Sequence, residues 1–277
     1  MRVVLVTLAV ALAGCPAVGP AATPTPEPRE YPPGVSVEGV VDAATLADAH
    51  DRAIKNTSYT LVSNRTVRYA NGTVASALFV RLGLAADRSF LVRTSTAGPE
   101  GPEFLGRPPA SGEFWSNGTV YVRALTRDGE TTYNEFTPPD SYVGTWRYWR
   151  ATVSFGGQES HARETIASVF GDVPTEVTGV RTVEGTTVYR LAGRGTVEGE
   201  FSKAGSDAVG NVSLTAEVTG SGLLRRMELS YVTFLGDQSV RVAWTVRYDD
   251  VGTTTVSRPA WFDRAVADNA SASESYP

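Results

Sequence analysis

Apolar and polar residues alternate most regularly in the last third of the chain. There, three runs place apolar side chains at every second position, with polar side chains between them. A period of two is typical of a β-strand with one buried and one solvated face. Short turns between the runs predict neighbouring antiparallel strands. The apolar positions are Val212, Leu214, Ala216 and Val218; Met227, Leu229 and Tyr231; and Val240, Val242, Trp244, Val246 and Tyr248.

The earlier part of the chain also predicts strands. Turn-forming pairs such as Asn71-Gly72 and Asn117-Gly118 separate the runs and indicate hairpins. Two segments have helical character: 43–55, which follows Asp42 as N-cap, and 157–170, which ends before Gly171. The strands predicted here are 59–69, 73–84, 89–95, 113–115, 119–125, 131–136, 180–183, 186–192 and 197–201.

These elements predict a mainly β, α+β fold built on a single antiparallel sheet. Two helices hardly cover a sheet of about ten strands, so the sheet has to curl on itself. We therefore expect a curved half-barrel or incomplete barrel, with about two helices packed on its concave side. Such a sheet can enclose a cavity for one apolar ligand. The same apolar face can also simply pack a filled core.

The N-terminus follows a different pattern. Arg2 precedes an apolar run, from Val3 to Gly14, that is too short to span a bilayer and matches the apolar part of a signal peptide. The run ends in Leu12-Ala13-Gly14-Cys15, which resembles a lipobox. Cleavage there would leave a lipid-modified Cys15 as the first residue of the mature chain. The alternative is an ordinary secreted protein whose cysteine is incidental.

The residues after Cys15 are rich in proline and threonine, which favours an extended tether. This order places the rest of the chain at the extracytoplasmic face of the cell membrane, held there by a lipid anchor. We expect a signal peptide at 1–14, lipidated Cys15 and its tether at 15–36, a β domain at 37–268 and a disordered tail at 269–277.

Composition narrows the choice of partners. The formal net charge is -5 and no basic patch occurs, so nucleic acid is not an expected partner. A single cysteine excludes a disulfide within the chain, so the core has to hold a monomeric domain together. Lysine occurs only at Lys55 and Lys203, while arginine is frequent. This bias indicates a GC-rich genome, with a haloarchaeon as the first expectation and an actinobacterium as the second.

Asparagines in the N-x-S/T pattern are glycosylation candidates if the organism glycosylates its surface proteins. At Asn71-Gly72 and Asn117-Gly118 the turn itself also explains the asparagine. The candidates are Asn56, Asn64, Asn71, Asn117 and Asn211, and a sixth sequon at Asn269 lies in the expected tail.

The sequence contains no recognisable arrangement for catalysis or metal binding. The only histidines, His50 and His161, lie on different predicted helices and far apart in the chain. The sequence has no H-x-x-x-H, H-E-x-x-H or G-x-S-x-G pattern and no P-loop. We therefore expect no catalytic residue, no metal and no cofactor, and a protein that is not an enzyme.

Two segments resemble the lipoprotein-carrier superfamily that includes LolA and the LppX-LprG proteins. The run Thr178 to Leu191 after helix 157–170 is similar to that family's helix, turn and hairpin. The run Val246 to Pro259 is similar to that family's last strand and to the proline-containing segment that ends its domain. In that family the sheet wraps a cavity that holds lipid acyl chains. The resemblance therefore implies a hydrophobic ligand, and it carries no catalytic signature.

Three functions stay open at this point. The first, which we favour, is a surface-tethered carrier or binding protein for a lipid or another hydrophobic ligand. The second is a structural or interaction lipoprotein of the cell envelope with a filled core, and the third is a secreted hydrolase. The aromatic residues near Trp146 are core under a loop, a cavity mouth, or a contact patch for a partner or membrane. Under the first function the cavity-lining candidates are Val212, Leu214, Val218, Met227, Leu229, Tyr231, Val242, Trp244, Val246 and Trp146.

Overall fold

The computed structural model describes residues 30–136, 162–197 and 209–273 of the chain. Three helices occur in these ranges: α1 (Ala43–Ile54), α3 (Ala162–Asp172) and α4 (Phe262–Ser273). The strands are β1 (Val35–Ser36), β2 (Gly39–Val40), β3 (Tyr59–Tyr69), β4 (Val74–Leu84), β5 (Phe90–Ala97), β6 (Ala110–Ser116), β7 (Tyr121–Arg127), β8 (Glu130–Phe136), β9 (Thr175–Val183), β10 (Thr186–Val197), β11 (Val209–Thr219), β12 (Leu224–Leu235) and β13 (Gln238–Asp249).

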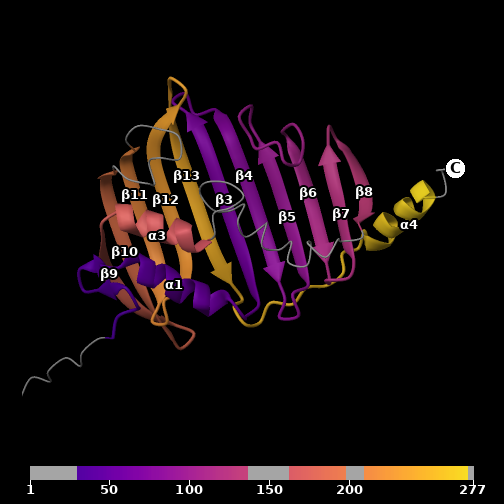
Figure 1. Ribbon diagram of the computed structural model, residues 1–277. Helices are drawn as coiled ribbons and strands as arrows, with labels where there is room; N and C mark the ends of the chain where they lie inside the picture. Colours follow the sequence, from indigo (N-terminus) through magenta and orange to yellow (C-terminus); the bar gives the residue numbers. More distant parts are fainter. Residues whose placement is uncertain (1–29, 137–161, 198–208, 274–277) are drawn as a thin grey trace, which may run out of the picture. The chain divides into compact units, whose positions relative to one another are not determined.

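The predicted fold class is confirmed. Eleven of the strands form one antiparallel sheet in the order β8-β7-β6-β5-β4-β3-β13-β12-β11-β10-β9, so β8 and β9 are its edge strands within the described residues (Figure 1). Strands β3–β8 and β9–β13 are two meanders of sequential neighbours. The pairing of β3 with β13 joins them at the centre of the sheet.

The two faces of the sheet differ sharply. We call the face that carries Leu61, Leu82 and Trp244 the core face, because its residues belong to one buried cluster that also includes side chains of α1 and α3. We call the opposite face, which carries Arg81 and Arg93, the back face. Figure 1 shows α1 and α3 lying across the β9–β13 half of the sheet. The alternation in sequence therefore corresponds to this division between two faces.

Helix α1 begins where the sequence predicts. Asp42 is its N-cap, and one carboxylate oxygen accepts a hydrogen bond from the Thr45 backbone N–H at 2.9 Å. The Thr45 hydroxyl donates to the other oxygen at 2.6 Å, and these bonds hold the pKa of Asp42 below its ordinary value. Helix α3 is described from Ala162 to Asp172, the predicted residues 157–161 lie outside the described residues, and Arg163 of α3 pairs with Asp48 of α1.

Helix α4 is an element that the sequence analysis did not predict. After β13, residues 250–261 run across the back face to α4, whose Ala265 is fully buried against Trp115 and Val122. The Trp115 and Phe262 rings meet edge to face, with centroids 5.2 Å apart. The helix continues to Ser273 and so passes Asn269, where we expected the tail to begin.

One of the two compact units of the chain spans Tyr31–Pro277. Residues 31–36, which the sequence analysis assigned to the tether, contact the sheet: the Tyr31 ring lies 5.6 Å from that of Tyr189, and Val35 is buried. The β1–β2 hairpin also covers part of edge strand β9, because the Val40 N–H donates to the Thr175 hydroxyl at 3.0 Å. In the described ranges, no helix is both long and apolar enough to cross a membrane.

Candidate functional site

Nine of the ten predicted cavity-lining residues lie together on the core face. They come from β11, β12 and β13, and the register places Leu229 opposite both Leu214 and Trp244. Each of the nine is at most 7% exposed. The tenth, Trp146, lies outside the described residues, as does the rest of the aromatic cluster at 141–153.

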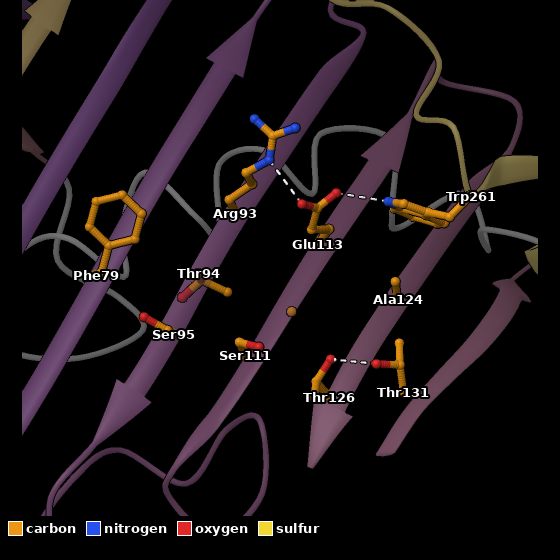
Figure 2. Close-up of a pocket in the computed structure, with 11 residues that line it drawn as sticks. Phe79, Arg93, Thr94, Ser95, Ser111, Glu113, Ala124, Thr126, Thr131 and Trp261 are labelled. Atoms are coloured by element: carbon orange, nitrogen blue, oxygen red, sulfur yellow. Dashed lines mark hydrogen bonds and ion pairs between the residues drawn. The ribbon is translucent and has the colours of Figure 1, made fainter. Parts of the chain in front are cut away.

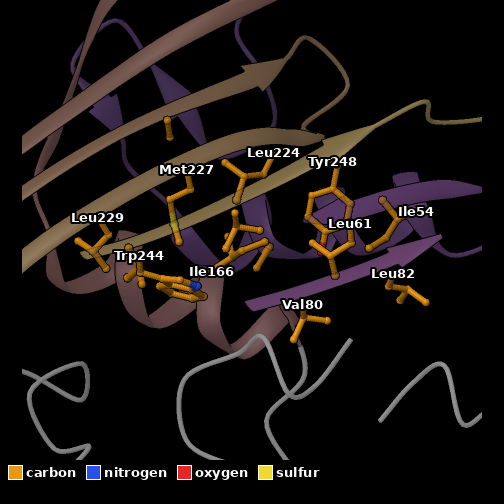
Figure 3. Packing of buried hydrophobic residues seen from close by; sticks show 14 of the residues in the cluster. Ile54, Leu61, Val80, Leu82, Ile166, Leu224, Met227, Leu229, Trp244 and Tyr248 are labelled. Atoms are coloured by element: carbon orange, nitrogen blue, oxygen red, sulfur yellow. The ribbon is translucent and has the colours of Figure 1, made fainter. Parts of the chain in front are cut away.

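Helix α3 covers this part of the core face. Ile166, Val169 and Phe170 belong to the same buried cluster, and Figure 3 shows Ile166 among Trp244, Met227 and Leu224. The Trp244 indole N–H donates to the Ser63 hydroxyl at 2.9 Å, so its polar atom is satisfied within the core. Over β11–β13, the residues chosen from sequence therefore pack against the protein's own helix.

The core face continues past the strands that α1 and α3 cross. On β4–β7 its buried side chains include Leu82, Val92, Phe114 and Leu125. None of these was among the cavity-lining residues predicted from the sequence. Leu105, from the loop between β5 and β6, lies over Gly112 of β6, where a Cβ atom would come within 3.5 Å of the leucine side chain. These side chains belong to the same buried cluster as those under the helices.

Two polar groups interrupt that apolar surface. Thr94 and Thr96 follow Phe90 and Val92 on the core face of β5 and are only 3% and 2% exposed. Neither hydroxyl has a hydrogen-bond partner among the described residues. A buried hydroxyl without a partner is costly, on the order of 1–3 kcal/mol, so the pair marks a place where a polar atom of a ligand would be stabilising.

A charged residue stands at an inward position of the face. Arg65 of β3 lies directly opposite Trp244, and its side chain is hydrogen-bonded to the Tyr231 hydroxyl. Burial raises the pKa of Tyr231, and the positive charge of Arg65 opposes that rise. Arg65 itself is exposed, so it places a solvent-accessible charged group on the core face. The sequence signal was available, because Leu61, Ser63, Arg65 and Val67 share one phase of the β3 alternation.

His50 has a structural role in the core. It is fully buried on α1, its Nδ1 accepts the Leu224 backbone N–H at 3.2 Å, and its ring meets that of Tyr248 edge to face. The other histidine, His161, lies outside the described residues. In the part of the chain that the structure describes, no three His, Cys, Asp or Glu side chains converge as a metal site would require.

All five glycosylation candidates are exposed. Asn71 and Asn117 also have the local role that their turns suggested, because their side-chain oxygens accept the backbone N–H groups of Thr73 and Thr119 at 3.0 and 3.1 Å. Asn64 lies on the back face of β3 and is exposed to solvent there. Cys15 lies outside the described residues.

The solved structures that match this chain do so at low identity, and they include the following three. LprF from Mycobacterium bovis aligns with a TM-score of 0.37 at 12% identity, over 78% of this chain and 95% of that chain. The lipoprotein LppX from Mycobacterium tuberculosis aligns with a TM-score of 0.36 at 12% identity, over 77% and 97%. A LolA superfamily protein from Nitrosomonas europaea gives 0.24 at 10% identity, over 78% and 96%.

A family model matches nearly the whole chain. The model of a family of unknown function, DUF7537, matches residues 1–265. No curated protein matches the chain.

Proposed function

The chain belongs to DUF7537, a family of unknown function, and we propose that it is a membrane-anchored extracytoplasmic lipoprotein that binds a lipid or another hydrophobic ligand. One observation carries the ligand proposal. The apolar core face extends beyond the strands that α1 and α3 cross, and there it holds two buried hydroxyls, on Thr94 and Thr96, without partners among the described residues.

The ligand's chemistry follows from this surface. Aliphatic and aromatic side chains such as Leu82, Val92 and Phe114 favour an acyl or isoprenoid chain, whose burial contributes about 0.8 kcal/mol for each CH₂ group. The threonine hydroxyls suit an ester, ether or hydroxyl oxygen near one end of that chain. Exposed Arg65, together with the Tyr231 hydroxyl to which it is hydrogen-bonded, suits a polar headgroup.

We expect a stoichiometric hydrophobic molecule to accompany the full chain when it is purified gently from its own or a related host. Native mass spectrometry followed by solvent extraction would detect and identify it, because a covalent anchor stays on the protein. Replacing both hydroxyls, in Thr94→Val/Thr96→Val, should weaken the complex roughly fivefold to thirtyfold, at about 1 kcal/mol for each lost hydrogen bond.

The matched control for that experiment is Thr66→Val, which makes the same chemical change on the back face of β3. It should leave the amount of bound molecule unchanged. The double variant should be at least as stable as the parent, because it removes two unpaired buried hydroxyls. A chain that carries no hydrophobic molecule after gentle purification would favour the envelope-interaction function instead.

The anchor is tested separately. We propose that Cys15 is lipidated, since it stands between an apolar run and a proline-rich segment at the expected distance from the N-terminus. Replacing it, in Cys15→Ser, should move the protein from the membrane fraction to the medium or leave it uncleaved, as seen by fractionation and intact mass. A Cys15→Ser variant that is processed and stays membrane-bound like the parent would contradict the anchor.

A further inference from the structure

The back face of the sheet carries a row of arginines. Arg226, Arg247, Arg81 and Arg93 occupy successive cross-strand positions on β12, β13, β4 and β5, with Val62 of β3 between the two pairs. Directly opposite residues in an antiparallel pair have Cβ atoms about 5 Å apart, so like charges there repel unless each is neutralised. The row therefore requires negative partners.

Carboxylates neutralise most of this row. Arg226 pairs with Glu228, Arg247 with Asp249 at 2.6 Å, and Arg93 with Glu113 at 2.9 Å. Arg81 is the exception: it is exposed, and no described residue gives it an ion pair or a hydrogen bond. Its direct neighbour across the β4–β5 pair is Arg93, another cation.

Arg93 uses only its Nε atom in its ion pair, so the rest of its guanidinium can bind another group. Its Nε donates to Glu113, whose second oxygen accepts the Trp261 indole N–H at 2.7 Å (Figure 2). The two Nη atoms of Arg93 carry no bond in that view and point away from Glu113. Glu113 also lines the hollow of about 380 Å³ drawn in Figure 2, and its charge disfavours an anion there.

A second hollow, of about 390 Å³, lies on the other side of Arg93, where residues 254–260 cross the back face. Three arginines line it, Arg81, Arg93 and Arg258, and no aspartate or glutamate is among its lining residues. Thr254, Thr255 and Ser257 add hydroxyl groups. Arg258 is partly engaged, because it pairs with Asp263 at 3.3 Å and lies over the Phe262 ring.

We propose that this hollow binds a tetrahedral oxyanion, a phosphate or sulfate group. An anion between Arg81 and Arg93 would convert their repulsion into two charge-assisted contacts, and the arginine fork matches the paired oxygens of such a group. The group comes either from a lipid headgroup or from a free anion in the surroundings. The site lies on the opposite face from the proposed hydrophobic ligand and does not depend on it.

The experiment is calorimetric titration of the full chain at constant ionic strength, in chloride, with inorganic phosphate, inorganic sulfate and glycerophosphoglycerol. The last is the water-soluble headgroup of phosphatidylglycerol. We expect saturable binding of at least one of them. Tighter binding of the inorganic ions would identify a free anion, and tighter binding of the diester would identify a headgroup. Replacing the unpaired arginine, in Arg81→Gln, should weaken binding about tenfold to hundredfold.

The control is Arg241→Gln. Arg241 of β13 also faces an arginine directly across the strand pair, Arg68, but it does not line the hollow. This variant should bind like the parent, and Arg81→Gln should melt no lower than the parent in chloride, because it removes a like-charge contact. The proposal is overturned if none of the three anions binds, or if Arg241→Gln and Arg81→Gln weaken binding equally.

Discussion

Replacing Trp244 by alanine should lower the free energy of unfolding by about 3–5 kcal/mol, as expected when a buried tryptophan is truncated. Trp244 is 3% exposed and packs beside Leu229 and the α3 side chain Ile166 (Figure 3). Truncation removes those contacts and leaves a cavity between the sheet and the helix. Urea denaturation of the full chain measures the loss. Thr245→Ala, one position along and on the back face, should stay within about 0.5 kcal/mol of the parent.

The indole N–H of Trp244 can be tested apart from the packing of the ring. Ser63→Ala removes the hydroxyl that accepts this bond at 2.9 Å and should cost about 1–3 kcal/mol, because a buried donor loses its acceptor. In a Trp244→Phe background the same serine change should cost much less. Equal costs of Ser63→Ala in the two backgrounds would show that the bond contributes nothing.

The second large effect is expected at Gly98, which turns the chain at the end of β5. Its φ is +87°, and a Cβ atom there would lie 2.4 Å from the Ala75 carbonyl oxygen. That oxygen also accepts the Glu100 N–H at 2.8 Å, so the backbone has little freedom to move away. We expect Gly98→Ala to cost about 2–4 kcal/mol, from left-handed strain together with the overlap. Thermal and urea unfolding would measure it.

Gly72 provides the matched comparison for Gly98. Its φ is +85°, but nothing lies within 4 Å of the position that a Cβ atom would take. Gly72→Ala should therefore show the backbone strain alone, about 1–2 kcal/mol. If the two variants lose the same stability, close approach to Ala75 is not what requires glycine at position 98.

The sheet was predictable where one face is wet and the other is buried. The β3 bounds Tyr59–Tyr69 match the prediction, and the alternating runs of the last third became β11, β12 and β13 on one buried face. A period of two fixes which side chains share a face, and turn residues such as Asn71 fix where strands end. The local pattern of apolar, polar and turn residues therefore predicts most of the fold.

The prediction of where strands end was wrong in β10 because of its glycines. Gly193 and Gly195 were read as a break between strands 186–192 and 197–201, but β10 runs on from Thr186 to Val197. A Cβ atom at position 193 would lie 2.5 Å from the Pro174 carbonyl oxygen, so glycine there permits close packing under the α3–β9 connection. No local pattern distinguishes that role from a turn.

The candidate site was only partly predictable, because its location depends on which strands the helices cover. The alternation correctly grouped Leu214, Leu229 and Trp244, but α3 lies over them. The β4–β7 half of the core face and the arginine row on the back face depend on register between distant strands. Arg81 and Arg93 become neighbours only when β4 pairs with β5. Helix α4 was missed because its buried side chains pack on the back face, where the sheet pattern predicted only solvent.

The central pairing of the sheet also sets the order in which the protein can be completed. Val67 of β3 pairs with Val242 of β13, 175 residues later, whereas the other strand pairs of the sheet join sequential neighbours. Closing so long a loop costs more entropy than forming a hairpin, so we expect this step to be slow. A chain made from its N-terminus presents β3 as a bare edge, open to mispairing with other chains, until β13 has emerged. The last long strand to be synthesised is therefore the one that completes the middle of the sheet.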